Sequence, residues 1–292
     1  MSTLMQLILN SIIAGGIYAL VAIGYTMVYG ILKFLNFAHG DLAMVSAYLS
    51  FFFFRYLGVP FYISITFSII LLVFLGIIIE KIAYKPLRNA SRLSCLITAI
   101  GVSIFLQSTV IIFFDARNRV FEKSTAQSLE FMGASITPLQ VIIILVSITS
   151  MILLHFFIKR AKIGKAMRAV ADNMTVASTV GIDVDQVISL VFAVGSGLAG
   201  VAGILIAWET NLNPTMGFFI GMKAFTAAVL GGIGSIRGAV VGAYFIGFAE
   251  NFGVWFIPTG YKNAIAFVVL ISILLIRPSG IFGMKREEEI KE

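Results

Sequence analysis

Long apolar runs separated by short charged stretches extend over nearly the whole chain. The runs lie at residues 4–32, 34–54, 56–79, 93–114, 138–158, 186–208, 217–233, 239–257 and 261–276. Most are about 20 residues long, and they lack the period-two alternation of membrane β-strands. Because a helix satisfies its own backbone hydrogen bonds, each run predicts a membrane-crossing helix. The last three runs are short, so we predict an all-α polytopic membrane protein with about eight or nine transmembrane helices.

The composition agrees with a lipid environment. Hydrophobic residues make up 59% of the chain and charged residues only 12%, with a mean hydropathy of +1.01; soluble domains are roughly a quarter charged. The net charge of +7 lies at the ends of the apolar runs, which is a signal of membrane topology and argues against a nucleic-acid partner. A single cysteine, Cys95, and two histidines leave no disulfide or metal cluster. We expect no metal and no cofactor in this chain.

Positive charge predicts the orientation in the membrane. Four basic residues lie in 81–92 and five in 159–168, whereas 115–137 balances three basic residues against three acidic ones. The two basic loops are two crossings apart and therefore lie on one side, which the positive-inside rule makes cytoplasmic. The basic C-terminal tail from Arg277 onward then lies inside and the N-terminus outside. Residues 1–32 carry no charge, so we expect no cleavable signal.

Polar and ionisable residues interrupt the second apolar run at Asn36, His39, Gly40 and Asp41. Such residues inside a membrane are costly and are functional candidates, and the glycine permits a broken helix beside a transport pathway. The alternative is a cytoplasmic turn in which Asp41 caps the next helix. The sequence leaves both interpretations open.

The pattern Leu-Asn-x-x-x-Gly of this first motif recurs from Leu212 to Gly217 and includes Asn213. Many transporters contain internal repeats with interrupted segments at matching positions, and the predicted topology puts the two copies on opposite sides, as in an inverted repeat. Three matching letters of common residue types are also what coincidence produces. Further along, a glycine-rich stretch at 230–238 lacks the ending of a phosphate loop and predicts a tight reversal between two short membrane helices.

The loop 159–185 is alanine-rich, helix-prone and basic. Two interpretations are equally compatible with it: a short helix that docks into a partner's groove, and an interfacial helix that rests on lipid headgroups. Elsewhere, isolated polar residues lie in or near the spans at Asn10, Gln107, Glu209, Glu250 and Asn251. Each is expected either to face a pathway or to bond a neighbouring helix. No set of side chains suggests catalysis.

Several blocks of sequence resemble the branched-chain amino acid ABC transporter permease family, and the chain looks like the shorter of that system's two permease subunits. Residues 16–31 (GIYALVAIGYTMVYGI) run into 36–41 (NFAHGD). Further matches are 167–173 (MRAVADN) with Gly181 and Ile182, 225–238, and 277–283 (RPSGIFG). Met174 stands where the family often has proline.

The resemblance implies that residues 1–292 form one permease domain of a binding-protein-dependent importer in a bacterial or archaeal cell (inner) membrane. The chain itself would be no enzyme: two cytoplasmic ABC ATPases would bind ATP-Mg, beside a second permease subunit and an external substrate-binding protein. The coupling segment would present Gly164, Arg168, Ala171, Asp172, Asn173, Ala177, Gly181 and Ile182. The candidate pathway residues are Asn36, His39, Gly40, Asp41, Asn213 and Glu250.

The resemblance implies branched-chain or related hydrophobic amino acids as the substrates, and a zwitterion with an apolar side chain is compatible with a mostly apolar path. Other amino acids, urea and short amides are alternatives within the family. An ion-coupled secondary transporter is the rival from another class. A structural or sensory membrane subunit without a pathway is the third hypothesis.

Overall fold

Helices form most of the computed structural model, which describes residues 2–88, 90–121, 128–131 and 133–283. The α-helices are α1 (Ser2–Leu32), α2 (Ala38–Arg55), α3 (Phe61–Ile79), α4 (Arg92–Phe114), α5 (Pro138–Arg160), α6 (Lys162–Asp172), α7 (Met174–Thr179), α8 (Val184–Glu209), α9 (Met216–Gly231), α10 (Ile236–Gly253) and α11 (Lys262–Ile276). A π-helical turn (Glu80–Tyr84) and two 3-10 turns (Lys85–Leu87 and Thr259–Tyr261) complete the helical structure.

Six of the described helices, namely α1, α3, α4, α5, α8 and α11, are long and apolar enough to cross a membrane. The pair α9 and α10 meets the same test jointly, with a bend of 120° between them, and raises the number of candidate spans to seven. The outer faces of α3, α4, α5 and α11 expose large apolar side chains such as Phe74, Ile112, Leu153 and Leu275, as lipid contact requires. The prediction of an all-α polytopic membrane protein is confirmed; the number of eight or nine crossings stays a prediction.

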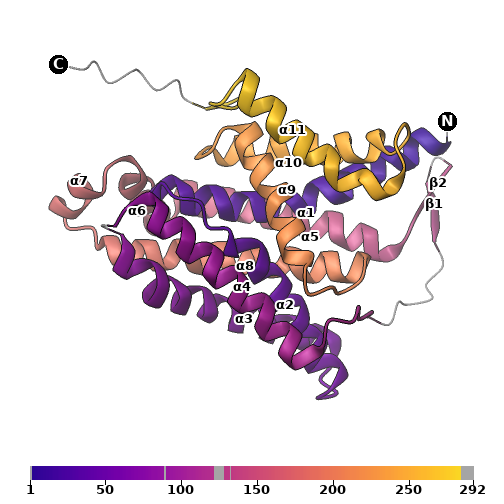
Figure 1. Ribbon diagram of the computed structural model, residues 1–292, viewed down its shortest axis with the longest axis horizontal. Helices are drawn as coiled ribbons and strands as arrows, with labels where there is room; N and C mark the ends of the chain where they lie inside the picture. The colour runs from indigo at the N-terminus through magenta and orange to yellow at the C-terminus, as the bar shows by residue number, and fades with distance from the viewer. Residues whose placement is uncertain (1, 89, 122–127, 132, 284–292) are drawn as a thin grey trace.

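The long helices α1 and α8 run through the middle of the molecule, with α2, α3 and α4 on one side and α9, α10 and α11 on the other (Figure 1). Helices α6 and α7 lie at one extremity, which we name the α6 end. A small antiparallel hairpin of β1 (Leu129–Phe131) and β2 (Ala134–Ile136) lies at the other extremity, near the start of α1; we name it the hairpin end. Among the described residues, β-structure is limited to this hairpin and an isolated antiparallel bridge between Arg119 and Leu212.

The element order of the first half recurs in the second half with opposite direction. The long helix α1 is followed by residues 33–37 and the shorter helix α2, and the long helix α8 is followed by residues 210–215 and the shorter helix α9. Each long helix packs on the other half: α1 on α9 and α10, and α8 on α2 and α3. This arrangement favours the inverted repeat over coincidence for the two Leu-Asn-x-x-x-Gly motifs.

Local sequence accounts for where several helices begin. Thr137 accepts a hydrogen bond from the backbone of Gln140, whose side chain accepts one from the backbone of Thr137, so that a capping box starts α5 just before Pro138. Asp183 caps the N-terminus of α8, because its side chain accepts a hydrogen bond from the backbone N–H of Gln186. Between α9 and α10 the chain reverses at Gly232, which has a φ of +98°. The predicted reversal at 230–238 is confirmed.

Candidate functional site

The polar motif of the second apolar run lies inside the helix bundle, where α2 begins. His39, Gly40 and Asp41 form the first turn of α2 and are buried. Asp41 does not cap the helix: its carboxylate accepts hydrogen bonds from Ser103 Oγ and, at 3.0 Å, from Gln107 Nε2, both on α4. The cytoplasmic-turn interpretation was therefore wrong, because α2 starts at a break within the bundle and the carboxylate bonds to another helix.

The neighbouring residues of this break are also held by side chains. Asn36 Oδ1 accepts a hydrogen bond of 2.6 Å from the hydroxyl of Tyr84 in the π-helical turn. The His39 ring meets the Tyr25 ring edge-on, with centroids 5.1 Å apart. Four of the predicted pathway residues thus come together in one buried cluster, which fixes the entry of α2.

The start of α9 lies directly against the start of α2. A Cβ atom added to Gly40 would collide with the carbonyl oxygen of Gly217 and lie 2.6 Å from the Cα of Gly221. A Cβ atom added to Gly217 would lie 2.7 Å from the Cα of Asp41. Both helices begin inside the bundle, and their first turns touch; that the two motifs enter from opposite sides of the membrane stays a prediction. We name this contact of α2 and α9 the glycine junction.

A buried ion pair joins three helices close to the glycine junction. Lys223 of α9 lies 2.9 and 3.0 Å from the two carboxylate oxygens of Glu250 on α10. Tyr18 of α1 donates to Glu250 at 2.9 Å and accepts from Lys223 at 3.1 Å. Glu250 is fully buried. A charge inside a membrane bundle is costly unless it is paired, so the three side chains specify how α1, α9 and α10 meet.

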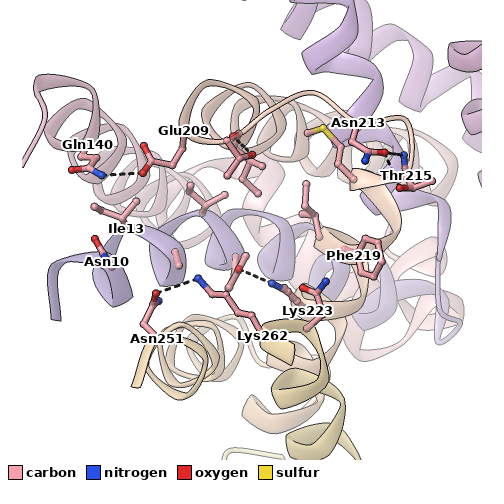
Figure 2. A pocket seen from close by; sticks show the side chains of 18 of the residues that line it. Asn10, Ile13, Gln140, Glu209, Asn213, Thr215, Phe219, Lys223, Asn251 and Lys262 are labelled. Carbon is pink, nitrogen blue, oxygen red and sulfur yellow. Dashed lines mark hydrogen bonds between the residues drawn. The ribbon is translucent and has the colours of Figure 1, made fainter. Parts of the chain in front are cut away.

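A cavity of about 600 Å³ opens beside this ion pair toward the hairpin end. Figure 2 shows that its side chains come from several helices and point toward a common space. Its polar lining consists of Gln6, Asn10, Tyr18, Gln140, Glu209, Thr210, Asn213, Thr215, Lys223, Asn251, Lys262 and Asn263, and its apolar lining includes Ile13, Ile17, Ile206, Met216, Phe219 and Ile220. We name it the hairpin-end cavity. Of the predicted pathway residues, Asn213 lines it, and Glu250 lies behind it.

A second cavity, of about 680 Å³, lies at the α6 end. Arg168, Ala171 and Asp172 of α6 form one wall, and α1 forms another from Thr26 to Ile31. We name it the α6-end cavity. Helix α1 lines the hairpin-end cavity with its first half and the α6-end cavity with its last turns. Between them, residues 19–25 are buried, a barrier of roughly 10 Å at 1.5 Å per residue.

The predicted coupling segment is helical and projects from the bundle (Figure 1). Helix α6 is amphipathic and buries Gly164, Met167 and Val170 against the rest of the chain. Arg168 donates to the backbone carbonyl of Ile158, and Asn173 caps α7 through the N–H of Val176. Of the predicted coupling residues, Gly164 and Ala177 are buried, Ala171 and Ile182 are half-buried, and Arg168, Asp172, Asn173 and Gly181 are exposed.

An ion-pair network ties the coupling segment to the α3–α4 connection. Arg88 bonds both the buried carboxylate of Glu80 and Asp185 in the first turn of α8, and Lys85 lies 2.6 Å from Asp185. Ser189 of α8 donates to Glu80 at 2.7 Å. The start of α8 is therefore connected by side-chain bonds to the π-helical turn that holds Asn36 through Tyr84.

Sequence reasoning missed three important residues of this region. Lys223 is a lone charge inside an apolar run. Because a charged residue within a membrane span is costly, it is a functional candidate on that ground alone. Tyr18 and Lys262 carry no such signal, because a tyrosine in a span and a lysine at a span end are both ordinary. The expected interhelix roles of Gln107 and Glu209 are confirmed by hydrogen bonds to Asp41 and Gln140.

Comparison with solved structures supports the fold. PsaBC from Streptococcus pneumoniae, in complex with Fab, resembles this chain with a TM-score of 0.50 and 16% sequence identity. The match covers 95% of this chain and 92% of that one. At this identity the likeness concerns the fold alone.

Curated relatives share much more of their sequence with this chain than that solved structure does. The high-affinity branched-chain amino acid transport system permease protein LivH of Salmonella typhimurium is 41% identical, over 98% of this chain and 97% of the relative. BraD, the corresponding permease protein of Pseudomonas aeruginosa, is 40% identical over 98% of both chains. A probable LivH of Methanocaldococcus jannaschii is 28% identical over 94% of this chain. The family model for the permease component of branched-chain amino acid transport systems matches residues 7–274. This chain belongs to the family of branched-chain amino acid transport system permease components.

Proposed function

We propose that this chain is one permease subunit of a binding-protein-dependent importer for branched-chain amino acids in a bacterial or archaeal cell (inner) membrane. A second permease, two cytoplasmic ATPases and an external binding protein complete the assembly. The similarity to LivH and BraD, both permease proteins of high-affinity branched-chain amino acid transport systems, supports the substrate. The observation that carries the proposal is the α6–α7 segment, a pair of short helices anchored by one buried face and exposed on the other.

The orientation follows from charge. The α6 end carries the basic residues of 81–92 and 159–168, so it faces the cytoplasm, and the hairpin end faces outward. Helices α1, α3, α5, α9 and α11 then run inward, and α2, α4, α8 and α10 run outward. This gives nine crossings if α9 and α10 count separately, with α2 and α9 starting within the membrane. The N-terminus lies outside and the C-terminal tail inside; residues 284–292 of that tail lie outside the described residues.

The two cavities supply a route for alternating access. The hairpin-end cavity is the outer vestibule, where a binding protein delivers its cargo, and the α6-end cavity is the inner vestibule. Residues 19–25 of α1 and the glycine junction close the space between them. Because α6 forms a wall of the inner vestibule, movement of α6 by an ATPase changes that vestibule directly. The ion-pair network of Arg88 carries the same movement to the entry of α2.

The apolar tip of the coupling segment offers a sharp test. Val176 and Val180 are 58% and 70% exposed although they are apolar, as expected of side chains that insert into a partner's groove. We expect Val180→Asp to reduce the amount of ATPase that co-purifies with the permease by at least about tenfold, because a charge in an apolar contact costs more than the 1.4 kcal/mol that corresponds to this factor.

The matched control is Val120→Asp. Val120 is 52% exposed and precedes the hairpin, at the opposite end of the molecule. This variant should retain full ATPase co-purification. Wild-type levels of ATPase on the Val180→Asp variant would contradict the docking of this segment.

The substrate is tested with the whole assembly in proteoliposomes. Leucine, isoleucine and valine, each presented on the external binding protein, are expected to stimulate ATP hydrolysis. Each should also be transported, only when ATP is present, to the side of the membrane on which the ATPases lie. A ligand can drive the transport cycle only through differential contacts with its states. If none of the three stimulates hydrolysis, the substrate assignment fails, whereas the assembly itself is tested by the co-purification above.

A further inference from the structure

The hairpin-end cavity has two charged poles on opposite walls. Lys262, at the start of α11, projects into the space from the same side as Asn251 of α10 (Figure 2). Glu209, at the end of α8, lies on the facing wall beside Gln140 (Figure 2). Among the described residues that line this cavity, Glu209 is the one carboxylate. Cation and anion therefore face a shared space without bonding to each other.

The two lysines of the cavity differ in how many of their donors are engaged. A lysine ammonium has three N–H donors. Lys223 donates to Glu250 Oε2 and to the hydroxyl of Tyr18, and its ammonium lies 2.9 Å from Glu250 Oε1. Lys262 has one described hydrogen bond, of 3.2 Å, to the neutral side-chain oxygen of Asn251. Lys223 is thus neutralised by a buried carboxylate, whereas Lys262 lines the cavity as a half-buried positive charge whose one described hydrogen bond goes to a neutral group.

The apolar part of the lining lies next to these poles. Ile13, Ile206, Phe219 and Ile220 contribute it from three helices. The volume of about 600 Å³ is within the range of small-molecule sites and exceeds the needs of one aliphatic side chain. The cavity therefore suits an amino acid as a zwitterion and is too large to select one side chain by shape.

We propose that the hairpin-end cavity is a binding site for the free amino acid within the permease, in which Lys262 binds the α-carboxylate and Glu209 receives the α-ammonium. This inference rests on the proposed function, since it places the imported substrate in this chain. Side-chain selection is left to the external binding protein. The permease site recognises what all α-amino acids share, and the apolar lining adds affinity for hydrophobic ones.

The test measures leucine binding to the purified wild-type assembly in nanodiscs without its binding protein. Lys262→Met is expected to weaken leucine binding by about tenfold to a hundredfold, the loss of a charge-assisted hydrogen bond. Lys262→Arg keeps the charge and should retain most of the affinity. Lys81→Met removes a lysine that is exposed near the α6 end and should change nothing.

Ligand variants separate binding from a fold defect. Leucinamide lacks the carboxylate and should bind the wild type more weakly than leucine, whereas Lys262→Met should not distinguish the two. 4-Methylpentanoate lacks the ammonium, so Glu209→Gln should weaken leucine binding but leave 4-methylpentanoate unaffected. The inference is overturned if Lys262→Met binds leucine as the wild type does, if the wild type does not discriminate against leucinamide, or if it binds no leucine.

Failure of the proposed binding site can be told apart from failure of the proposed importer function. Binding-protein-dependent, ATP-driven leucine uptake by the wild-type assembly tests the function independently of this site. Uptake in the wild type together with unchanged binding in Lys262→Met overturns the site and leaves the function intact. Absence of uptake in the wild type refutes the function itself.

Discussion

Lys223→Met is expected to destabilise the folded permease by about 3–5 kcal/mol. The substitution leaves the fully buried Glu250 carboxylate with Tyr18 as its one hydrogen-bond partner among the described residues, and a buried charge without its ion-pair partner is among the most costly defects of a buried site. At about 2–4 °C per kcal/mol, the midpoint of thermal unfolding of the purified protein should fall by on the order of 10 °C. Scanning fluorimetry of the detergent-solubilised chain measures this shift.

The double variant Lys223→Met/Glu250→Leu is the control for this prediction. Replacing both partners by apolar residues removes the unpaired charge, and such replacements of buried ion pairs are often neutral. Most of the lost stability should return, although Tyr18 then lacks its bond to the carboxylate. A Lys223→Met variant as stable as the wild type would show that the ion pair contributes nothing to the packing of α9 on α10.

Gly40→Ala should destabilise the protein by about 3 kcal/mol, the upper end of the cost of overpacking. The new methyl group would collide with the carbonyl oxygen of Gly217 and the Cα of Gly221. Both obstacles are backbone atoms, so relief requires that α2 and α9 separate and that the bonds of Asp41 to α4 shift. Thermal unfolding and ATP-driven leucine uptake should both fall.

Gly101→Ala is the matched control, because Gly101 is also a glycine inside a helix but has no heavy atom within 4 Å of the added Cβ. Alanine is the better helix former by up to about 1 kcal/mol, so this variant should be as stable as the wild type or slightly more stable. Equal behaviour of the two alanine variants would contradict the close contact at the glycine junction.

The apolar runs predicted the candidate spans well, because each helix that crosses a membrane needs its own apolar stretch of about 20 residues, wherever the other helices lie. The run 93–114 became α4 (Arg92–Phe114) and the run 138–158 became most of α5 (Pro138–Arg160). The interruption at Asn36 to Asp41 was also visible, since its residue types are costly in lipid wherever they lie.

Relations between distant segments were not accessible in the same way. Tyr18 and Lys223 meet across 205 positions of sequence, and neither carries a local signal of its partner. The repeated motif was legible as letters, but only the antiparallel packing of α1 and α8 brings Gly40 and Gly217 together. In the coupling segment, the burial of Gly164 depends on the backbone of Ile158 in α5, which helix propensity does not reveal.

The glycine junction has a consequence for how the chain is made. Gly217 follows Gly40 by 177 positions, which the ribosome covers in roughly 10–35 seconds. During that interval the start of α2 lies in the bilayer without α9. Asp41 is already satisfied by then, because Ser103 and Gln107 arrive with α4 in the same half. The first half of the chain therefore already contains the hydrogen-bond donors for its buried carboxylate, and α9, which is made later, packs against a glycine surface.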